Sequence, residues 1–145
     1  MRKIKMIAVL AAALAAGWAA AAEPTYESVQ ACHEKAQASK DPNQVAACLA
    51  DELKIVQAEH KDAVERVAVI AKRWDKKTNS RQRWNKLIQA GQSFDAFVRR
   101  ECEFVRMTTK GNQVKEKNAE LACRINYYRM RTDVLETRYL AAEKH

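Results

Sequence analysis

Glycine and proline are scarce in this chain, and their scarcity limits the folds that it can form. Three glycines and two prolines occur among 145 residues, and no stretch alternates apolar and polar residues as a half-buried β-strand does. Helices suffer least from this composition, because glycine weakens a helix and proline interrupts it. The sequence therefore predicts an all-α protein with no second domain.

The sequence motifs of common enzymes are also missing. There is no G-x-S-x-G, phosphate-binding loop, dinucleotide fingerprint or H-E-x-x-H, and the carboxylates are spread along predicted helix surfaces. Neither C-x-x-C nor H-x-x-x-H spacing occurs, which argues against a zinc site. We expect no catalytic residues, no cofactor and no metal.

What is present begins with an amino-terminal leader. Basic residues at positions 2, 3 and 5 precede an apolar run over 6–16, and three alanines at 20–22 form a small-residue cleavage site. The run is too short and too rich in alanine to predict a membrane span, and a retained anchor helix is the alternative interpretation. We expect a signal peptide over 1–22, cleavage after Ala22, and a periplasmic or secreted domain over 23–145. Removing the three basic residues lowers the net charge from +8 to +5.

Four cysteines follow this leader, and an even number in an exported chain indicates disulfides. Cys32, Cys48, Cys102 and Cys123 allow three pairings. A turn signal lies between the first two and Gly111 lies between the last two, so antiparallel helix pairs would bring each couple together. We favour Cys32–Cys48 and Cys102–Cys123, each worth about 3 kcal/mol in the chain-entropy model.

Four helices are expected between the turn signals. The first covers 26–39, the second runs from Pro42 to about 76, and the third and fourth flank Gly111. The second has a heptad-like seam, made of Leu49, Leu53, Val56, His60, Ala63, Val67, Ile70 and Trp74. The expected fold is an elongated antiparallel bundle of one short and three long helices, stapled by two disulfides.

Several residues refine this picture. Asp41 is expected to cap the second helix and Asn79 the third. The apolar phase runs through Gly91, so we expect one helix there and leave open a bend at that residue. His60 is interpreted as a buried seam histidine in preference to a pH switch or a ligand.

One surface feature suggests binding. Basic residues crowd around the turn between the second and third helices, against the single acid Asp75, and form what we call the basic tip: Lys72, Arg73, Lys76, Lys77, Arg81, Arg83 and Lys86. The tip suits an anionic partner, such as an acidic protein, anionic lipid or wall polymer. The simpler interpretation, which we favour, is that Trp74 and Trp84 pack across the helix pair while the cations solvate its end. Nucleic acid is not expected as a partner of an exported chain.

The cysteines and the last two helices resemble the lysozyme inhibitor LprI-like family. In that family an aromatic-rich segment of the form Trp-x-x-aromatic-Arg-x-x-x-Cys ends at the third cysteine. Phe94, Phe97 and Arg99 occupy this segment before Cys102, with phenylalanine in place of tryptophan and the arginine displaced by one position. After the fourth cysteine the family tends to show an arginine eight residues on and a leucine four later; the matching residues are Cys123, Arg131 and Leu135. Cys32 and Cys48 match the opening pair, whereas the family's Leu-Asn-x-x-Tyr is missing near Leu53.

The resemblance implies an exported, non-enzymatic envelope protein whose partner is lysozyme or another wall hydrolase. The simpler structural interpretation of the matching residues is that Phe94, Phe97 and Leu135 are core residues and that Arg131 anchors the fold through an interhelical salt bridge. A net charge of +5 would repel basic lysozymes, so a local acidic patch is needed, with Asp51, Glu52 and Glu59 as candidates. The alternative function is a periplasmic stress chaperone or adaptor that holds unfolded or anionic partners on its helical surface and basic tip.

Overall fold

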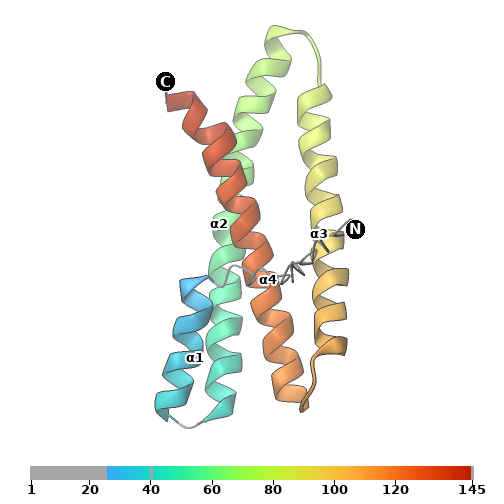
Figure 1. Cartoon of the computed structure of the whole chain (residues 1–145). Helices are drawn as coiled ribbons and strands as arrows, with labels where there is room; N and C mark the ends of the chain where they lie inside the picture. Colours follow the sequence, from blue (N-terminus) through green and yellow to red (C-terminus); the bar gives the residue numbers. More distant parts are fainter. Residues whose placement is uncertain (1–25, 40, 145) are drawn as a thin grey trace, which may run out of the picture.

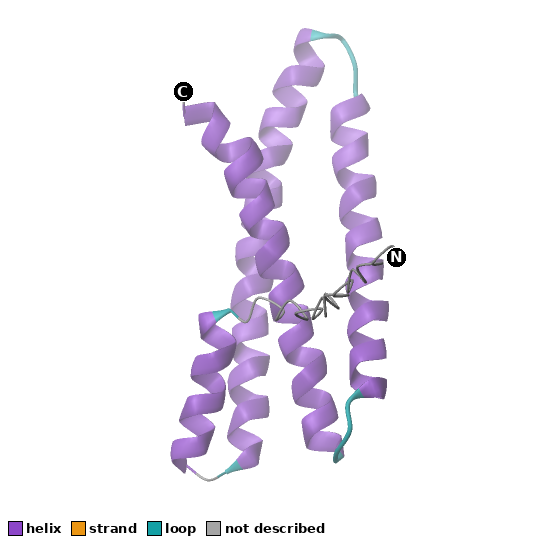
Figure 2. Cartoon of the chain, in the orientation of Figure 1, coloured by secondary structure: helices purple, strands orange, loops and turns teal. Residues whose placement is uncertain are grey.

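The computed structural model describes residues 26–39 and 41–144, and in this part of the chain every long element is a helix (Figure 2). The helices are α1 (Glu27–Ser39), α2 (Pro42–Lys77), α3 (Gln82–Thr108) and α4 (Gln113–Leu135). A π-helical turn, η1 (Glu136–Leu140), and a 3₁₀ turn, η2 (Ala141–Lys144), extend α4. The predicted bundle of one short and three long helices is confirmed. The predicted signal peptide lies outside the described residues.

The helix α2 organises the molecule. It has 36 residues, which corresponds to roughly 54 Å at 1.5 Å per residue. Figure 1 shows α1 beside the first half of α2, with α3 and α4 running the length of the bundle and the end of α4 leaning away from α3. None of the described helices combines the length and the apolar character needed to cross a bilayer.

The core has two parts, which both use the predicted seam of α2. The first lies where α1, α2 and α4 meet, and its buried members are Val29, Cys32, Ala36, Val45, Leu49, Leu53, Val56, Leu121 and Ile125. The second lies farther along α2 and contains Ala63, Val67 and Leu135. Between them, the rings of His60, Phe94 and Tyr128 meet at centroid distances of 5.3–5.6 Å. The buried position of His60 agrees with its interpretation as a seam residue.

Two disulfides staple the helices as the turn geometry predicted. Cys32–Cys48 joins α1 to α2 with Cα atoms 5.6 Å apart, and Cys102–Cys123 joins α3 to α4 with Cα atoms 5.5 Å apart. All four cysteines are therefore oxidised, and none is left as a thiolate nucleophile or metal ligand.

The helix ends confirm one predicted cap and correct another. Asp41 caps α2, because its side chain accepts a hydrogen bond of 2.9 Å from the backbone N of Asn43. Asn79 does not cap α3; it adopts a left-handed backbone with a φ of 47°, which asparagine tolerates, and turns the chain. The N-cap position of α3 belongs to Arg81, whose side chain makes no capping bond.

Gly91 neither breaks α3 nor is required by close packing. The helix is continuous over 82–108, and a Cβ atom added at Gly91 would meet nothing within 4 Å. Leu87, before the glycine, packs against the second core cluster, and Val98 and Cys102, after it, are buried, so the apolar phase continues on both sides of Gly91. Gly111, by contrast, has a φ of 146° in the turn to α4, a conformation that other residues rarely adopt.

Candidate functional site

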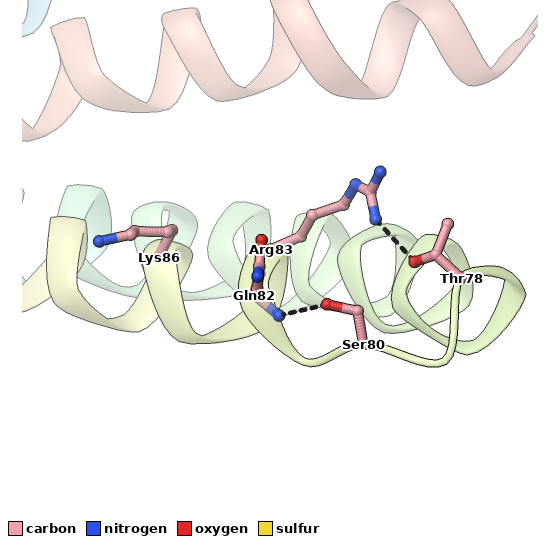
Figure 3. A pocket seen from close by; sticks show the side chains of 5 residues that line it. All are labelled: Thr78, Ser80, Gln82, Arg83 and Lys86. Atoms are coloured by element: carbon pink, nitrogen blue, oxygen red, sulfur yellow. Dashed lines mark hydrogen bonds between the residues drawn. The ribbon is translucent and has the colours of Figure 1, made fainter.

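The basic tip predicted from the sequence forms one end of the bundle. Its residues come from the last turns of α2 and the first turns of α3, so that the turn brings them together. Figure 3 shows part of this end, where a shallow pocket of about 550 Å³ is lined by Thr78, Ser80, Gln82, Arg83 and Lys86. The hydroxyl of Thr78 accepts a hydrogen bond of 3.1 Å from Arg83, and the hydroxyl of Ser80 accepts one of 3.1 Å from the backbone N of Gln82.

Asp75, the single acid of this region, holds the tip together from inside. Its side chain is only 3% exposed and accepts hydrogen bonds from the backbone N of Arg83 at 3.2 Å and of Trp84 at 2.9 Å. It also accepts one of 3.4 Å from the Arg83 guanidinium. Asp75 therefore supplies, from α2, the cap that Arg81 does not provide to α3. The sequence shows Asp75 as an isolated acid among basic residues, but it does not indicate that this acid caps α3.

The charge of Asp75 is stabilised by these donors. Burial by itself raises the pKa of Asp75, but the hydrogen bonds from Trp84 and Arg83 outweigh it, and the pKa lies below its usual value. One of the seven cations of the basic tip, Arg83, is thereby paired with the buried carboxylate of Asp75.

The tryptophans beside the tip do not share one role. Lys72 places its ammonium 4.2 Å from the centroid of the Trp84 ring, a cation–π contact. Trp74 remains 38% exposed and lines a different cavity, between α2, α3 and the end of α4. Trp74 lines this cavity together with residues of α3, but its ring is only partly covered, so the expected packing across the helix pair is incomplete at Trp74.

The predicted salt bridge of Arg131 is also wrong. Its guanidinium lies 5.4 Å from the Phe94 ring, and its buried Nε atom makes no hydrogen bond with the described residues. The acids of α2 that face α4, Glu52 and Glu59, form ion pairs with another arginine, Arg129. Leu135 is buried as expected, but Phe97 is 48% exposed, because it stacks edge-on against Tyr127 at the surface of the α3–α4 pair.

The candidate acids of α2 have different partners. Arg129 reaches across from α4 to Glu52 at 2.6 Å and Glu59 at 2.8 Å, whereas Asp51 pairs with Lys54 on its own helix at 2.9 Å. Burial raises the pKa of Glu52, but the hydrogen bond and the charge of Arg129 act against it, and the pKa lies below its usual value. Of the three candidate acids, Glu52 and Glu59 therefore face α4, and Asp51 does not pair with it.

These two acids continue into a longer acidic surface that the sequence did not reveal. Arg66 bonds Asp62 at 2.8 Å and Glu136 at 2.8 Å, and Asp133 accepts a hydrogen bond of 3.0 Å from Tyr26. We call this surface the acidic seam; its charged residues are Glu52, Glu59, Asp62, Asp133 and Glu136 with Arg66 and Arg129. Five carboxylates against two guanidinium groups leave it with a net charge of −3.

The requirements of a metal site are not met among the described residues. Within 26–39 and 41–144, no three histidine, cysteine, aspartate or glutamate side chains gather in a way that could hold a metal ion. What the arrangement offers is a rigid, oxidised scaffold with two surfaces of opposite charge, the basic tip and the acidic seam.

Comparison with known proteins gave one match. A family model described as Lysozyme inhibitor LprI matches residues 32–135. This range begins at the first cysteine and contains both disulfides. No curated protein and no solved structure matches the chain.

Proposed function

The chain belongs to the LprI family of lysozyme inhibitors, and from this premise we propose that it is an exported protein that binds lysozyme and blocks it. The match over residues 32–135 carries the proposal, because it spans most of the bundle and all four cysteines. The family is one of inhibitors and not of enzymes, which supports a binding role. The leader-like segment 1–22 and the two disulfides support a periplasmic or secreted location, since disulfides persist in oxidising compartments.

The acidic seam is the surface that suits a basic lysozyme. Common lysozymes are strongly cationic, so the net charge of the chain without its leader, +5, opposes their approach. A local charge of −3 along α2 and α4 provides complementarity at short range, where it governs docking and orientation. Asp62 and Glu136 have side chains that are 65% and 49% exposed, so both can reach a partner.

The test of the function is a cell-wall lysis assay. The protein, expressed from its full coding sequence in an exporting host and purified oxidised, is titrated against several types of lysozyme and against other wall hydrolases. We expect saturable, dose-dependent inhibition of at least one lysozyme. No inhibition at a large molar excess over every enzyme would contradict the proposal and leave the family match as a statement about fold.

A pair of matched variants tests the surface separately. Asp62→Asn with Glu136→Gln removes two negative charges from the acidic seam while preserving side-chain size, and Lys76→Gln with Lys77→Gln removes two positive charges from the basic tip. All four positions are exposed, so folding should be little affected. We expect the seam variant to associate more slowly with lysozyme and the tip variant to associate as fast or faster. The opposite ranking would move the docking surface to the tip.

The second candidate function is a periplasmic chaperone or adaptor for unfolded or anionic partners. The exposed cations Lys76, Lys77 and Arg81 at the basic tip favour it. Binding through this tip should weaken steeply as salt is added, because exposed charges are screened. Suppression of aggregation of an unfolded envelope protein, with no inhibition of any lysozyme, would favour this candidate.

A further inference from the structure

A cavity of about 440 Å³ lies between α2, α3 and the end of α4, beside the basic tip. Val67 of α2, Leu87 of α3 and Leu135 of α4 contribute to its apolar walls, and Trp74 and Tyr139 add aromatic surface. In Figure 1 the end of α4 leans away from α3. The volume lies within the range of small-molecule sites, about 300–1,000 Å³.

The charges that line this cavity all have one sign. Arg83, Lys86 and Arg131 are its ionisable cations, and no aspartate or glutamate lines it. In Figure 3 the Arg83 side chain extends from α3 toward Thr78, whose hydroxyl accepts its hydrogen bond. Arg83 is bonded to Asp75 and Lys86 to Gln89 at 3.2 Å, so these two contribute charge with part of their bonding capacity used.

Arg131 is the cation in this cavity that lacks a counter-ion among the described residues. Its Nε atom is buried without a hydrogen bond, its guanidinium lies 5.4 Å from the Phe94 ring, and no ion pair joins it to a described carboxylate. A partly buried cation without such a partner is costly, because the lost hydration is not replaced. The terminal nitrogens of a guanidinium can bond a carboxylate through two parallel hydrogen bonds, which would give the charge of Arg131 a counter-ion.

We propose that this cavity binds an amphipathic carboxylate, a small molecule with one carboxylate and an extended apolar body. The carboxylate bonds Arg131 within the field of Arg83 and Lys86, while the apolar body covers Leu87, Leu135 and the exposed part of Trp74. A fatty acid of medium length has this chemistry. The site is separate from the surface proposed for lysozyme, so the two proposals can fail independently.

The experiment titrates dodecanoate, below its micelle concentration, into the oxidised protein expressed from its full coding sequence. Binding is followed by calorimetry and by tryptophan fluorescence, since Trp74 lines the cavity. We expect saturable binding at one site. Methyl dodecanoate, which lacks the charge, and acetate, which lacks the apolar body, should each bind at least about tenfold more weakly.

Three variants locate the site. Arg131→Gln should weaken dodecanoate binding roughly tenfold to a hundredfold, as expected for the loss of charge-assisted hydrogen bonds. Arg138→Gln is the matched control, because it removes one exposed cation from η1 outside the cavity. Val134→Glu places a carboxylate in the cavity at a position that is 47% exposed, and it should abolish binding without lowering the melting temperature.

The proposal is overturned by any of four results. The first is an absence of binding by the folded wild-type protein, and the second is equal affinity for dodecanoate and its methyl ester. The others are equal affinity in the Arg131 and Arg138 variants, or full binding by a folded Val134→Glu protein.

Discussion

At the scale of single residues, His60 shows how burial in a helical seam changes the pKa of a titratable side chain. It is 8% exposed, lies between the rings of Phe94 and Tyr128, and contacts the Thr132 hydroxyl through Nδ1 at 3.4 Å. Burial lowers its pKa most, Asp95 on α3 raises it, and Arg131 on α4 lowers it, with a net shift below the ordinary value. The native state therefore disfavours protonation of the ring relative to the unfolded state.

The consequence is a loss of stability in mildly acid solution. Because the unfolded state binds a proton that the native state excludes, the free energy of unfolding falls as pH drops below about 6.5, by at most about 1.4 kcal/mol per pH unit for one such group. His60→Leu should flatten the dependence between pH 7 and 5, measured by denaturant unfolding. Glu52 and Asp75 have lowered pKa values, so their contributions to stability are lost in more acid solution. They therefore add little to the change between pH 7 and 5.

A control separates His60 from histidine in general. His33 is exposed on α1, and His33→Gln should keep the wild-type pH dependence. If His60→Leu also keeps it, the desolvated ring is not the source of the slope.

At the scale of elements, α1 depends on its disulfide more than any other helix. It has 13 residues, too few for a stable isolated helix, and its buried residues Val29, Cys32 and Ala36 pack into the core formed with α2 and α4. Cys32–Cys48 closes a segment with a sequence separation of 16, worth about 3 kcal/mol in the chain-entropy model.

We therefore expect Cys32→Ala with Cys48→Ala to release α1 while the rest of the bundle survives. Hydrogen exchange should accelerate over 27–39 and stay slow around Val56 and Ile125. The matched variant, Cys102→Ala with Cys123→Ala, cuts a link between two long helices and should loosen α3 and α4 instead. Unchanged exchange in α1 after loss of its disulfide would show that packing alone holds it.

The elements themselves were predictable from the sequence, because their signals are local. The seam from Leu49 to Ile70 and the turns at Asp41 and Gly111 lie within a few residues of the structures that they specify. The two disulfides followed from the same turns. The roles of Asp75 and Arg131 could not be predicted in this way, because each depends on which side chains another helix places beside it. The same holds for the acidic seam, whose members are up to 84 residues apart in sequence between Glu52 and Glu136.

At the scale of the whole molecule, charge is separated by position. The basic tip occupies the end of the α2–α3 hairpin, and the acidic seam runs along the contact between α2 and α4. A basic lysozyme approaching from a distance meets the positive mean field of the chain, whereas at contact it meets a surface with a net charge of −3. The two effects act over different ranges, since the Debye length is about 10 Å at 0.1 M salt.

Added salt therefore tests which surface a partner uses. Screening removes the long-range repulsion of a basic lysozyme before it weakens close contacts with Glu59, Asp62 and Glu136, so inhibition should change little or strengthen between about 0.02 and 0.15 M salt. Binding of an acidic wall polymer to the basic tip should weaken steeply over the same range, because attraction at a distance drives it. Measuring both by the salt dependence of the association rate gives opposite signs for the two surfaces. A roughly tenfold loss of lysozyme affinity over this range would mean that long-range attraction brings lysozyme to the protein, which the charge distribution described above does not provide.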